Sequence, residues 1–476
     1  MPRDTFESPL ATRNASREML RLFSPQHRFS LWRRMWLELA RCQKELGITR
    51  ITEEAISQMQ AAVDQIDFDR AAEWERKLRH DVMAHVHTFE EAAPAARGII
   101  HLGATSQTIV DNADLVIFRD AMRLLTGRLA NVIDALGTFA ASWRDQPTLG
   151  YTHFQPAQLT TVGKRATLWA QDFALDLEEL EHRIAGLRFR GVKGTTGTQA
   201  SFLALFEGDH TKCDQLDQAF TQAFGFEQSF LVTGQTYPRK VDAQIVNTLA
   251  GIAVSVHKFC NDIRLLAGLK QVEEPFETDQ VGSSAMAYKR NPMRCERATG
   301  LARFVMSLAS SPLMTAAGQW LERTLDDSSN RRLSMAEAFL AIDGALLLVI
   351  NVARGLVVYP KVIEAAITAE LPFMATEEIL VAGVRAGGDR QVLHERIRLH
   401  SLAAAEQVKR FGRPNDLIDR LRSDPAFTGV KLDDVLNPSR FVGRAPRQVD
   451  RFLKEVVEPI RQRYRSELGA VVELQV

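Results

Sequence analysis

The stretch VDAQIVNTLAGIAVSVHKFCNDIRLL, residues 241–266, predicts one long amphipathic helix. Its apolar residues recur at intervals of three or four, which places them on one helical face for about seven turns. No proline interrupts residues 239–274, so nothing in the segment breaks such a helix. The apolar positions are Val241, Ile245, Leu249, Ile252, Val256, Phe259, Ile263 and Leu266. Helices of this length usually belong to bundles, and the stretch therefore favours an all-α fold.

Working outward from this stretch, residues 157–237 and 313–359 also lack proline and leave room for further long helices. Strand-like alternation is scarce, and glycine-rich segments such as GVKGTTG at 191–197 are typical of connections. We predict three mostly helical domains, at residues 1–111, 112–359 and 360–476, of which the central one is a long-helix bundle.

Composition excludes several classes of protein. With 476 residues, 45% of them hydrophobic and 25% charged, the chain is neither disordered nor fibrous. Lys plus Arg and Asp plus Glu both number 59, so no net charge attracts nucleic acid or an anionic membrane. The first residues lack a signal-peptide pattern, and the uncharged apolar run 344–353 is shorter than the ~20 residues that span a bilayer. We expect a cytoplasmic protein with no nucleic-acid or membrane partner.

The four cysteines, Cys42, Cys213, Cys260 and Cys295, stand far apart without a CxxC pair. That spacing fits a reducing compartment and argues against a structural zinc site. We expect buried small hydrophobes, although Cys295 lies near a segment with candidate chemistry.

The first segment with candidate chemistry is LRHDVMAHVH, residues 78–87. His80 and His87 could share a helical face and hold a metal, but no cysteine or HExxH pattern supports this interpretation. Arg79, His80 and Asp81 suit an anionic ligand better. The alternative is that these residues form the solvated start of a surface helix and have no function in binding.

Two further segments combine polar side chains with a predicted helix start. In GATS, residues 103–106, hydroxyls precede a helix whose free N–H groups could bind an anion, although Ser and Thr are also common N-caps. In THFQPAQ, residues 152–158, His153 could transfer a proton or be merely structural, and Pro156 is expected to begin the next helix. The loop 191–197 lacks the ending of a P-loop.

Residues 320–332, WLERTLDDSSNRR, gather the hydroxyl and guanidinium groups that bind phosphate, although charge runs are usually solvated faces. The donors are Arg323, Ser328, Arg331 and Arg332. The last segment, GSSAMAYKRNP at 282–292, is predicted to be a loop, because glycine and serine open it and Asn-Pro closes it.

Together these segments resemble the signatures of the fumarase/aspartase superfamily. Residues 282–292 resemble its GSSxMPxKxNP loop with Ala287 in place of proline, and residues 193–202 and 103–112 (KGTTGTQASF and GATSQTIVDN) resemble its other two signatures. The similarity runs from about Arg13 past Arg332. The segments RHDVMAHVH, THFQPAQ, GQTYPRKVD and LDDSSNRR point to the adenylosuccinate lyase branch.

The resemblance implies three helical domains, with a twenty-helix core in a homotetramer whose active sites are shared between subunits. It also implies elimination of fumarate from adenylosuccinate, giving AMP, and from the succinyl-carboxamide ribotide SAICAR, giving AICAR. No metal or organic cofactor is expected. A proton beside a carboxylate is hard to remove, so the reaction needs a positioned base and stabilisation of the charged intermediate.

By position in the motifs, Ser283 would be the base, supported by Lys289, and His153 the general acid, oriented by Glu296. His80 resembles a second histidine near the substrate. The positions that resemble substrate contacts are Arg13, Arg79, Asp81, Thr105, Ser106, Gln235, Asn291, Arg297, Arg323, Ser328 and Arg332. Two departures are Ala287 and Asn14, the latter standing where relatives often carry tyrosine. The alternatives are another lyase of the superfamily, such as argininosuccinate lyase or a fumarase, and an inactive structural relative.

Overall fold

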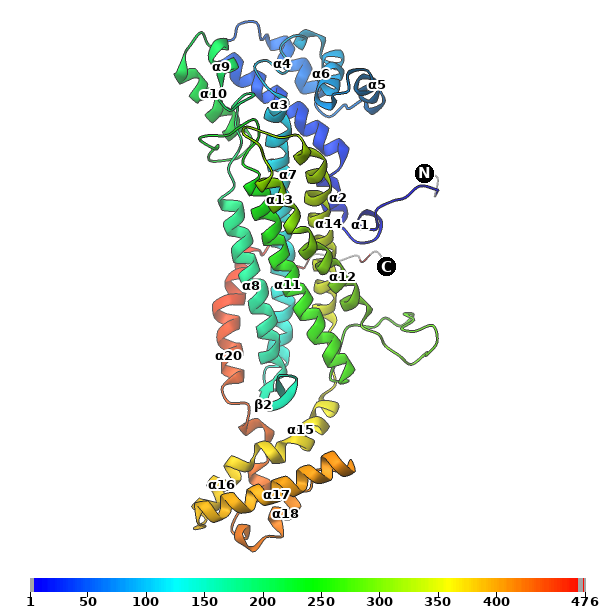
Figure 1. The fold of residues 1–476 in the computed structure, drawn as a ribbon, viewed down its shortest axis with the longest axis vertical. Coiled ribbons are helices and arrows are strands. Elements are labelled where there is room, and N and C mark those ends of the chain that lie inside the picture. Colours follow the sequence, from blue (N-terminus) through cyan, green and yellow to red (C-terminus); the bar gives the residue numbers. More distant parts are fainter. Residues whose placement is uncertain (1–3, 470–473, 475–476) are drawn as a thin grey trace.

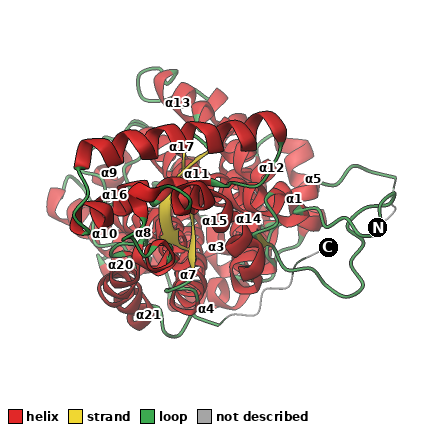
Figure 2. Cartoon of the chain, turned by 90° about the horizontal axis from the view of Figure 1, so that it is seen from below, coloured by secondary structure: helices red, strands yellow, loops and turns green. Residues whose placement is uncertain are grey.

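Long helices along one axis define the shape of the protein. The computed structural model describes residues 4–469 and residue 474. Figure 1 shows an elongated chain with a helical bundle in the middle and smaller helices at both ends, and Figure 2 shows the bundle end-on. The bundle consists of α7 (Ser106–Ser142), α8 (Val162–Ala185), α11 (Lys240–Gly268), α12 (Met293–Leu308) and α14 (Asp326–Gly355), with α13 (Ser310–Ala317) after α12. The prediction of an all-α fold is confirmed.

Helix α11 has the face that its sequence predicts. All eight apolar positions from Val241 to Leu266 are buried, none with more than 8% of its surface exposed. Helix α7 starts with a capping box, in which the Thr105 side chain accepts from the backbone N–H of Thr108 and the Thr108 side chain accepts from the backbone N–H of Thr105. Burial of such faces against one another is the main stabilising contribution to a bundle of this kind.

At the end of the bundle where α7 begins, the helices of residues 25–92 pack with two helices from later in the chain, whereas the two short helices before them lie along the bundle (Figure 1). The N-terminal elements are α1 (Pro9–Arg13), α2 (Arg17–Leu22), α3 (Pro25–Glu45), α4 (Glu53–Ala62), α5 (Phe68–Leu78), α6 (Asp81–Ala92) and η1 (Pro94–Ala96). The later pair are α9 (Ala200–Leu205) and α10 (His210–Ala223). The segment 191–197 is irregular, as expected.

The C-terminal part has its own small core at the opposite end, around buried residues such as Ile379, Leu393 and Leu417. Its elements are α15 (Pro360–Met374), α16 (Thr376–Arg385), α17 (Arg390–Phe411), α18 (Leu417–Arg422), η2 (Pro425–Phe427), α19 (Leu432–Val435) and η3 (Pro438–Arg440). The chain then returns along the bundle through α20 (Ala445–Phe452), η4 (Leu453–Val457) and α21 (Glu458–Arg463). The division into three domains stays a prediction.

The strands among the described residues form two short antiparallel pairs. These are β1 (Pro147–Thr152) with β2 (Gln155–Thr161), and β3 (Val272–Glu273) with β4 (Val357–Val358). The expectation that Pro156 begins a helix is wrong, because Pro156 lies in β2 opposite Tyr151 and α8 starts only at Val162. In a two-stranded hairpin each strand is an edge strand, where a residue without an N–H is tolerated.

Helix α14 is buried in the bundle core. Among the described residues it is the one helix long and apolar enough to cross a membrane by length and composition, with a mean hydropathy of 2.0 over an 18-residue window. Of that window 78% is buried inside the protein, which is also the situation of a core helix in a soluble protein. The four cysteines are free and buried, as expected.

Candidate active site

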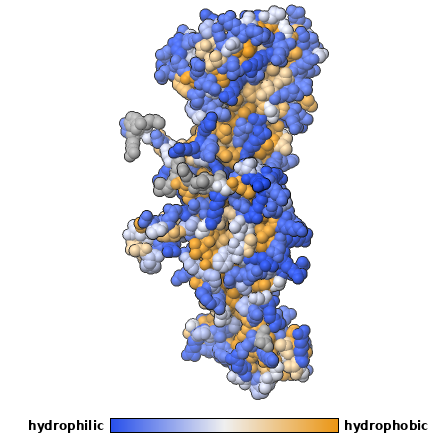
Figure 3. Space-filling view, turned by 180° about the vertical axis from the view of Figure 1, so that it is seen from behind, coloured by the Kyte–Doolittle hydropathy of each residue, from blue (hydrophilic) through white to orange (hydrophobic). Residues whose placement is uncertain are grey.

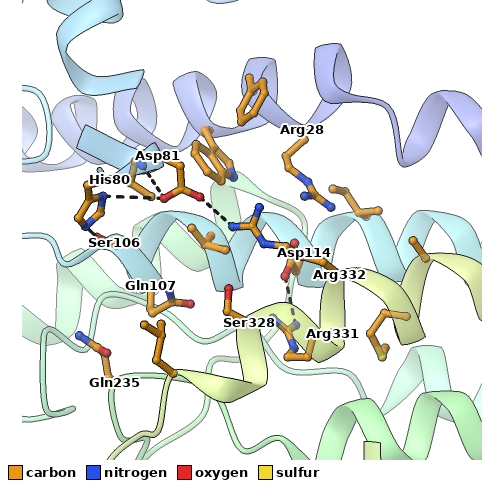
Figure 4. Close-up of a pocket in the computed structure, with 18 of the residues that line it drawn as sticks. Arg28, His80, Asp81, Ser106, Gln107, Asp114, Gln235, Ser328, Arg331 and Arg332 are labelled. Atoms are coloured by element: carbon orange, nitrogen blue, oxygen red, sulfur yellow. Dashed lines mark hydrogen bonds and ion pairs between the residues drawn. The ribbon is translucent and has the colours of Figure 1, made fainter. Parts of the chain in front are cut away.

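A cavity of about 470 Å³ lies where the N-terminal helices meet the bundle. Figure 4 shows polar side chains from α3, α6, α7 and α14 converging on it. It brings together eight of the predicted site residues, which are Arg79, His80, Asp81, Ser106, Gln235, Arg323, Ser328 and Arg332. Segments separated by more than two hundred residues in the sequence therefore form one side of a candidate site.

The turn between α5 and α6 places Arg79 and His80, two of the predicted site residues, at the cavity. Arg79 ends α5 in the left-handed region (φ 55°), and His80 in extended conformation is the N-cap of α6. Nε2 of His80 lies 3.4 Å from the Ser106 hydroxyl at the start of α7. Nη2 of Arg332 donates to Asp81 at 2.8 Å, which ties α14 to α6.

The protonation state of Asp81 follows from two opposing effects. Burial alone would raise the pKa of its carboxyl group, but the hydrogen bonds from Arg332 and from the backbone N–H of Val82 lower that pKa below its ordinary value. Asp81 is therefore a carboxylate near neutral pH, and part of the Arg332 charge is balanced before any ligand binds.

Gln235 connects two of the predicted segments. Its Nε2 donates to the Thr105 hydroxyl at 3.2 Å, and its Oε1 accepts from Nη1 of Arg323 at 3.1 Å. Thr105 does not line the cavity, but this hydrogen bond brings it into the same network. Arg323 also contacts Asp327 at 3.5 Å, so its guanidinium is held from two sides.

Beneath the cavity lies a buried ionic network that the sequence did not reveal. Arg239 donates to Asp327 at 2.8 Å and to Asp111 at 3.0 Å, and all three side chains are at most 1% exposed. A second part centres on Arg331, which contacts Asp242, Asp114 and the Tyr237 hydroxyl at 2.7, 3.1 and 2.6 Å. The segments YPRKVD and LDDSSNRR contain the charged residues of this network, but the sequence alone is equally compatible with solvent-exposed charges.

The network fixes the charge of its arginines. Burial and the charge of Arg331 act to lower the pKa of Arg239, but the carboxylate of Asp111 raises it above the ordinary value. Removal of one member of such a buried network leaves an unpaired charge, a change that costs about 3–5 kcal/mol. The network rigidly links α7, α11 and α14 beneath the cavity.

The loop 274–292 carries a second group of predicted residues. The Ser283 hydroxyl oxygen accepts from the backbone N–H groups of Ala285 (3.3 Å) and Met286 (3.1 Å). Asn291 donates from its side chain to the Gly282 carbonyl at 2.8 Å and closes the base of the loop. Lys289 is exposed, and among the described residues its ammonium group forms no hydrogen bond or ion pair with Ser283 or with a residue that lines the cavity.

Three predicted residues lie beside this loop. Glu296 is on the first turn of α12, where Arg264 contacts it at 3.9 Å. Nε of Arg297 donates to the Asn14 side chain at 2.9 Å, and Arg297 also donates to the Arg13 carbonyl. Asn14 thus orients Arg297.

His153 stands apart from both groups. It occupies the turn of the β1–β2 hairpin, and both it and Phe154 have left-handed backbone angles (φ 53° and 57°). Its side chain is exposed. The hairpin follows the C-terminal end of α7, whose 37 residues extend about 55 Å, whereas Ser106 is at the N-terminal end. A single chain therefore does not bring His153 to the cavity.

The other histidines of the segment 78–87 have structural surroundings. His85 is buried and stacks on Phe29 with ring centroids 3.8 Å apart, and His87 stacks on Trp74 and contacts Glu90 at 3.2 Å. Within residues 4–469, no group of three His, Cys, Asp or Glu side chains has the arrangement of a metal site.

Comparison with known proteins supports the resemblance along the whole chain. Residues 29–307 match the family described as "Lyase", and residues 372–452 match "Adenylosuccinate lyase C-terminus". The chain is 54% identical to adenylosuccinate lyase of Saccharomyces cerevisiae, with 98% of each chain covered, and 50% identical to that of Schistosoma mansoni, with 97% of each covered.

Solved structures with similar folds have more distant sequences. The structure of 3-carboxy-cis,cis-muconate lactonizing enzyme from Pseudomonas putida matches with a TM-score of 0.80 at 21% identity, covering 96% of this chain and 99% of that one. Fumarate lyase from Mesorhizobium sp. BNC1 matches with a TM-score of 0.77 at 24% identity, covering 95% and 100%. These likenesses concern the fold, whereas the matches to the curated relatives cover 97–98% of this chain at 50–54% identity. The chain belongs to the adenylosuccinate lyase family, in the fumarase/aspartase superfamily.

Proposed function

We propose that this protein is a carbon–nitrogen lyase of purine nucleotide synthesis, which eliminates fumarate from adenylosuccinate to give AMP and from SAICAR to give AICAR. The observation that carries the proposal is the cavity in which hydroxyl and guanidinium groups of α7, of α14 and of the segments that precede α6 and α14 converge. Arg323, Ser328 and Arg332 are suited to a phosphate, because guanidinium forks and hydroxyls match its oxygens. The adenylosuccinate lyases to which the chain is similar support the choice of substrate.

Ser283 is the proposed base. Two backbone N–H groups already donate to its hydroxyl oxygen, and such donors stabilise the negatively charged form of an oxygen acid. A nearby ammonium group would add to this effect, and Lys289 on the same loop is the proposed source. Movement of the exposed loop over the substrate would place Lys289 and the side chain of Asn291 against the succinyl group.

His153 is the proposed acid that protonates the leaving nitrogen, with Glu296 orienting its ring and His80 assisting near the substrate. Arg13, Arg79, Asp81, Thr105, Ser106, Gln235 and Arg297 complete the proposed substrate contacts. Side chains carry every proton in this reaction, so we expect no metal or organic cofactor. We also propose a cytoplasmic location and no binding to nucleic acid or membranes.

A homotetramer with shared sites accounts for the separation of His153 from the cavity. The bundle surface carries exposed apolar side chains, including Leu168 (50% exposed) and Leu175 (54%) on α8 and Val254 (55%) on α11. Figure 3, which shows the molecule from behind, has further hydrophobic patches among hydrophilic ones in the middle of that face. Exposed apolar side chains of this kind occur at interfaces, so we propose that bundles of four chains pack together into the twenty-helix core.

The direct test is fumarate release from adenylosuccinate, SAICAR and argininosuccinate. We expect turnover of the two purine substrates and none of argininosuccinate, because the guanidinium and hydroxyl groups of the cavity recognise phosphate. Fumarate release from argininosuccinate alone would replace the proposed function with that of another lyase. Absence of turnover on all three would favour an inactive structural relative.

The same assay tests the base. Ser283→Ala removes the hydroxyl but leaves the cavity unchanged, so turnover of adenylosuccinate should fall at least ~100-fold with little change in KM. Ser284→Ala is the matched control, because the neighbouring hydroxyl has no proposed role. Near-normal turnover of Ser283→Ala would exclude Ser283 as the base and make Ser284 the next candidate.

A further inference from the structure

Arg28 lines the cavity but has no place in the signature segments. It lies in the first turn of α3, and its side chain is partly buried. In Figure 4 its guanidinium points from α3 toward the cavity, on the side opposite the Ser328 hydroxyl of α14. Phe29, the next residue, and Trp32 also line this wall.

Arg28 has no carboxylate partner within the part of the chain that the structure describes. Among the described residues no carboxylate forms an ion pair with it, and its Nε is buried without a hydrogen-bond partner. Three other arginines of the cavity have carboxylate partners: Arg323 contacts Asp327, Arg331 contacts Asp114 and Asp242, and Arg332 contacts Asp81. Arg28 therefore differs from the arginines that are anchored by acids.

A buried donor without a partner is unfavourable, because it loses its hydrogen bonds to water and gains none in return. An anion entering the cavity would restore that hydrogen bond and balance the charge. Among the groups that share the cavity with Arg28 are the Ser328 hydroxyl and the Arg332 guanidinium, donors that fit the several oxygens of a phosphate. The cavity carboxylates Asp81 and Asp114 are paired with Arg332 and Arg331. A carboxylate offers two oxygens and would leave part of this set unused.

We propose that Arg28 is a further substrate-binding residue, whose guanidinium contacts the phosphate of the bound nucleotide together with Ser328 and Arg332. The inference rests on the proposed function for the identity of the nucleotide. It assigns to α3 a direct part in substrate binding, in addition to its packing against α7.

Calorimetric titration of the intact protein with AMP and with adenosine tests the inference without relying on turnover. Arg28→Gln should weaken AMP binding by about tenfold or more, the usual effect of losing a charged hydrogen bond, and change adenosine binding by less than about twofold. Arg34→Gln is the matched control, because Arg34 is on the same helix, is 53% exposed at the side chain and pairs with Asp64 at the surface. It should leave the binding of both ligands unchanged.

A second variant, Arg28→Met, separates binding from folding. It removes the unpartnered charge and keeps most of the side-chain length, so the ligand-free protein should be at least as stable to heat as the wild type while AMP binding falls as in Arg28→Gln. A marked loss of thermal stability with an unchanged ratio of AMP to adenosine affinity would show a structural role and overturn the inference.

Two other results would also overturn it. Equal weakening of AMP and adenosine binding would place Arg28 against the nucleoside, and weaker binding of fumarate with unchanged AMP binding would place it against a carboxylate. A wild-type protein that binds AMP through Arg28 but releases no fumarate would overturn the proposed function and leave the Arg28 inference standing.

Discussion

His153 occupies a backbone conformation that its residue type does not favour. Two-residue hairpin turns with positive φ at both positions usually contain Asn and Gly, whereas this turn contains His153 and Phe154 at φ 53° and 57°. Each such conformation costs about 1–3 kcal/mol, and residues of this kind cluster at functional sites, where the conformation positions a side chain that is needed there. The hairpin presents the imidazole to solvent at the end of the bundle, where another chain can contact it.

We predict that the pH profile of fumarate release is bell-shaped and that one limb depends on His153. The acid must carry a proton, so activity falls on the alkaline side as that proton is lost, while loss of the deprotonated base produces the acidic limb. His153→Gln should lower kcat by about 100-fold or more and remove the alkaline limb. If the limb persists in the residual activity, another residue donates the proton, and His80→Gln is the next variant to measure.

His85 gives a separate prediction about stability. Burial, and secondarily the charge of Arg33, lower its pKa from 6.5 to about 4, while Asp81 acts in the opposite direction. The unfolded chain therefore binds more protons than the folded one between pH 6.5 and 4, so the free energy of unfolding decreases as pH falls through that window. The contribution of neutral His85 to stability is complete above the window. His101, which accepts a hydrogen bond from Trp36, is shifted in the same way.

The test replaces His85 by phenylalanine, which can keep the stacking on Phe29 and has no ring nitrogen. The free energy of unfolding is measured with urea at pH 7 and at pH 5, at one protein concentration. Between these pH values it should decrease by roughly 2 kcal/mol less for His85→Phe than for the wild type. His87→Phe, on the same helix but partly exposed, is the control. Equal losses in wild type and His85→Phe would mean that His85 titrates normally in the folded protein.

At the scale of elements, sequence periodicity predicted the helices and failed on the hairpin. Helix α11 was predictable because its apolar stripe continues for many turns and every member is buried. The β1–β2 hairpin was missed because its turn lacks Asn-Gly, and because a proline such as Pro156 is as typical of a helix start as of an edge strand. The buried network around Arg239 was missed because charges paired in three dimensions leave no periodic pattern in the sequence.

The loop 282–292 contains a turn in which Ala287 occupies a position that favours proline. The N–H of Lys289 donates to the Met286 carbonyl at 3.0 Å, so Met286 to Lys289 form a turn with Ala287 at its second position. Proline is favoured at that position because its fixed φ matches the turn. The proline that the superfamily signature carries here therefore suits the local geometry of this chain.

We predict that Ala287→Pro makes the loop more ordered and slightly more active. Fewer conformations of the open loop should favour closure by about 0.5–1 kcal/mol, which corresponds to a rise of roughly two- to fivefold in kcat/KM. Ala285→Pro is the matched control, because it removes an N–H that donates to Ser283 and should lower kcat. Reduced activity of Ala287→Pro would show that closure needs a backbone conformation that proline cannot adopt.

At the scale of the whole molecule, the sequence motifs suggested which residues form the site but not where those residues lie in the folded chain. The structure gathers eight of them at one cavity, places the Ser283 loop elsewhere on the bundle, and holds His153 at the far end of α7. Motif order along the chain contains no information about these distances. Only the resemblance to the superfamily implied that residues far apart in one chain meet across subunits.

The shared-site proposal predicts that two inactive variants restore each other. His153→Gln and Ser283→Ala proteins should each be nearly inactive, because every site of either tetramer lacks the acid or the base. When they are mixed, dissociated and reassembled, a site that takes its histidine and its serine from different chains receives both intact residues with a probability of one half times one half. Activity should therefore approach about one quarter of the wild-type value in an equal mixture.

The control is the double variant His153→Gln, Ser283→Ala mixed with wild-type protein. Under the same shared-site geometry that mixture also yields about one quarter intact sites, whereas sites built within one chain would yield about one half. Mixed tetramers are verified with two affinity tags, so that absence of recovered activity cannot reflect absence of exchange. Tagged mixed tetramers without activity would show that one chain supplies both residues, and a large movement of the hairpin or the loop would then be needed to bring His153 to Ser283.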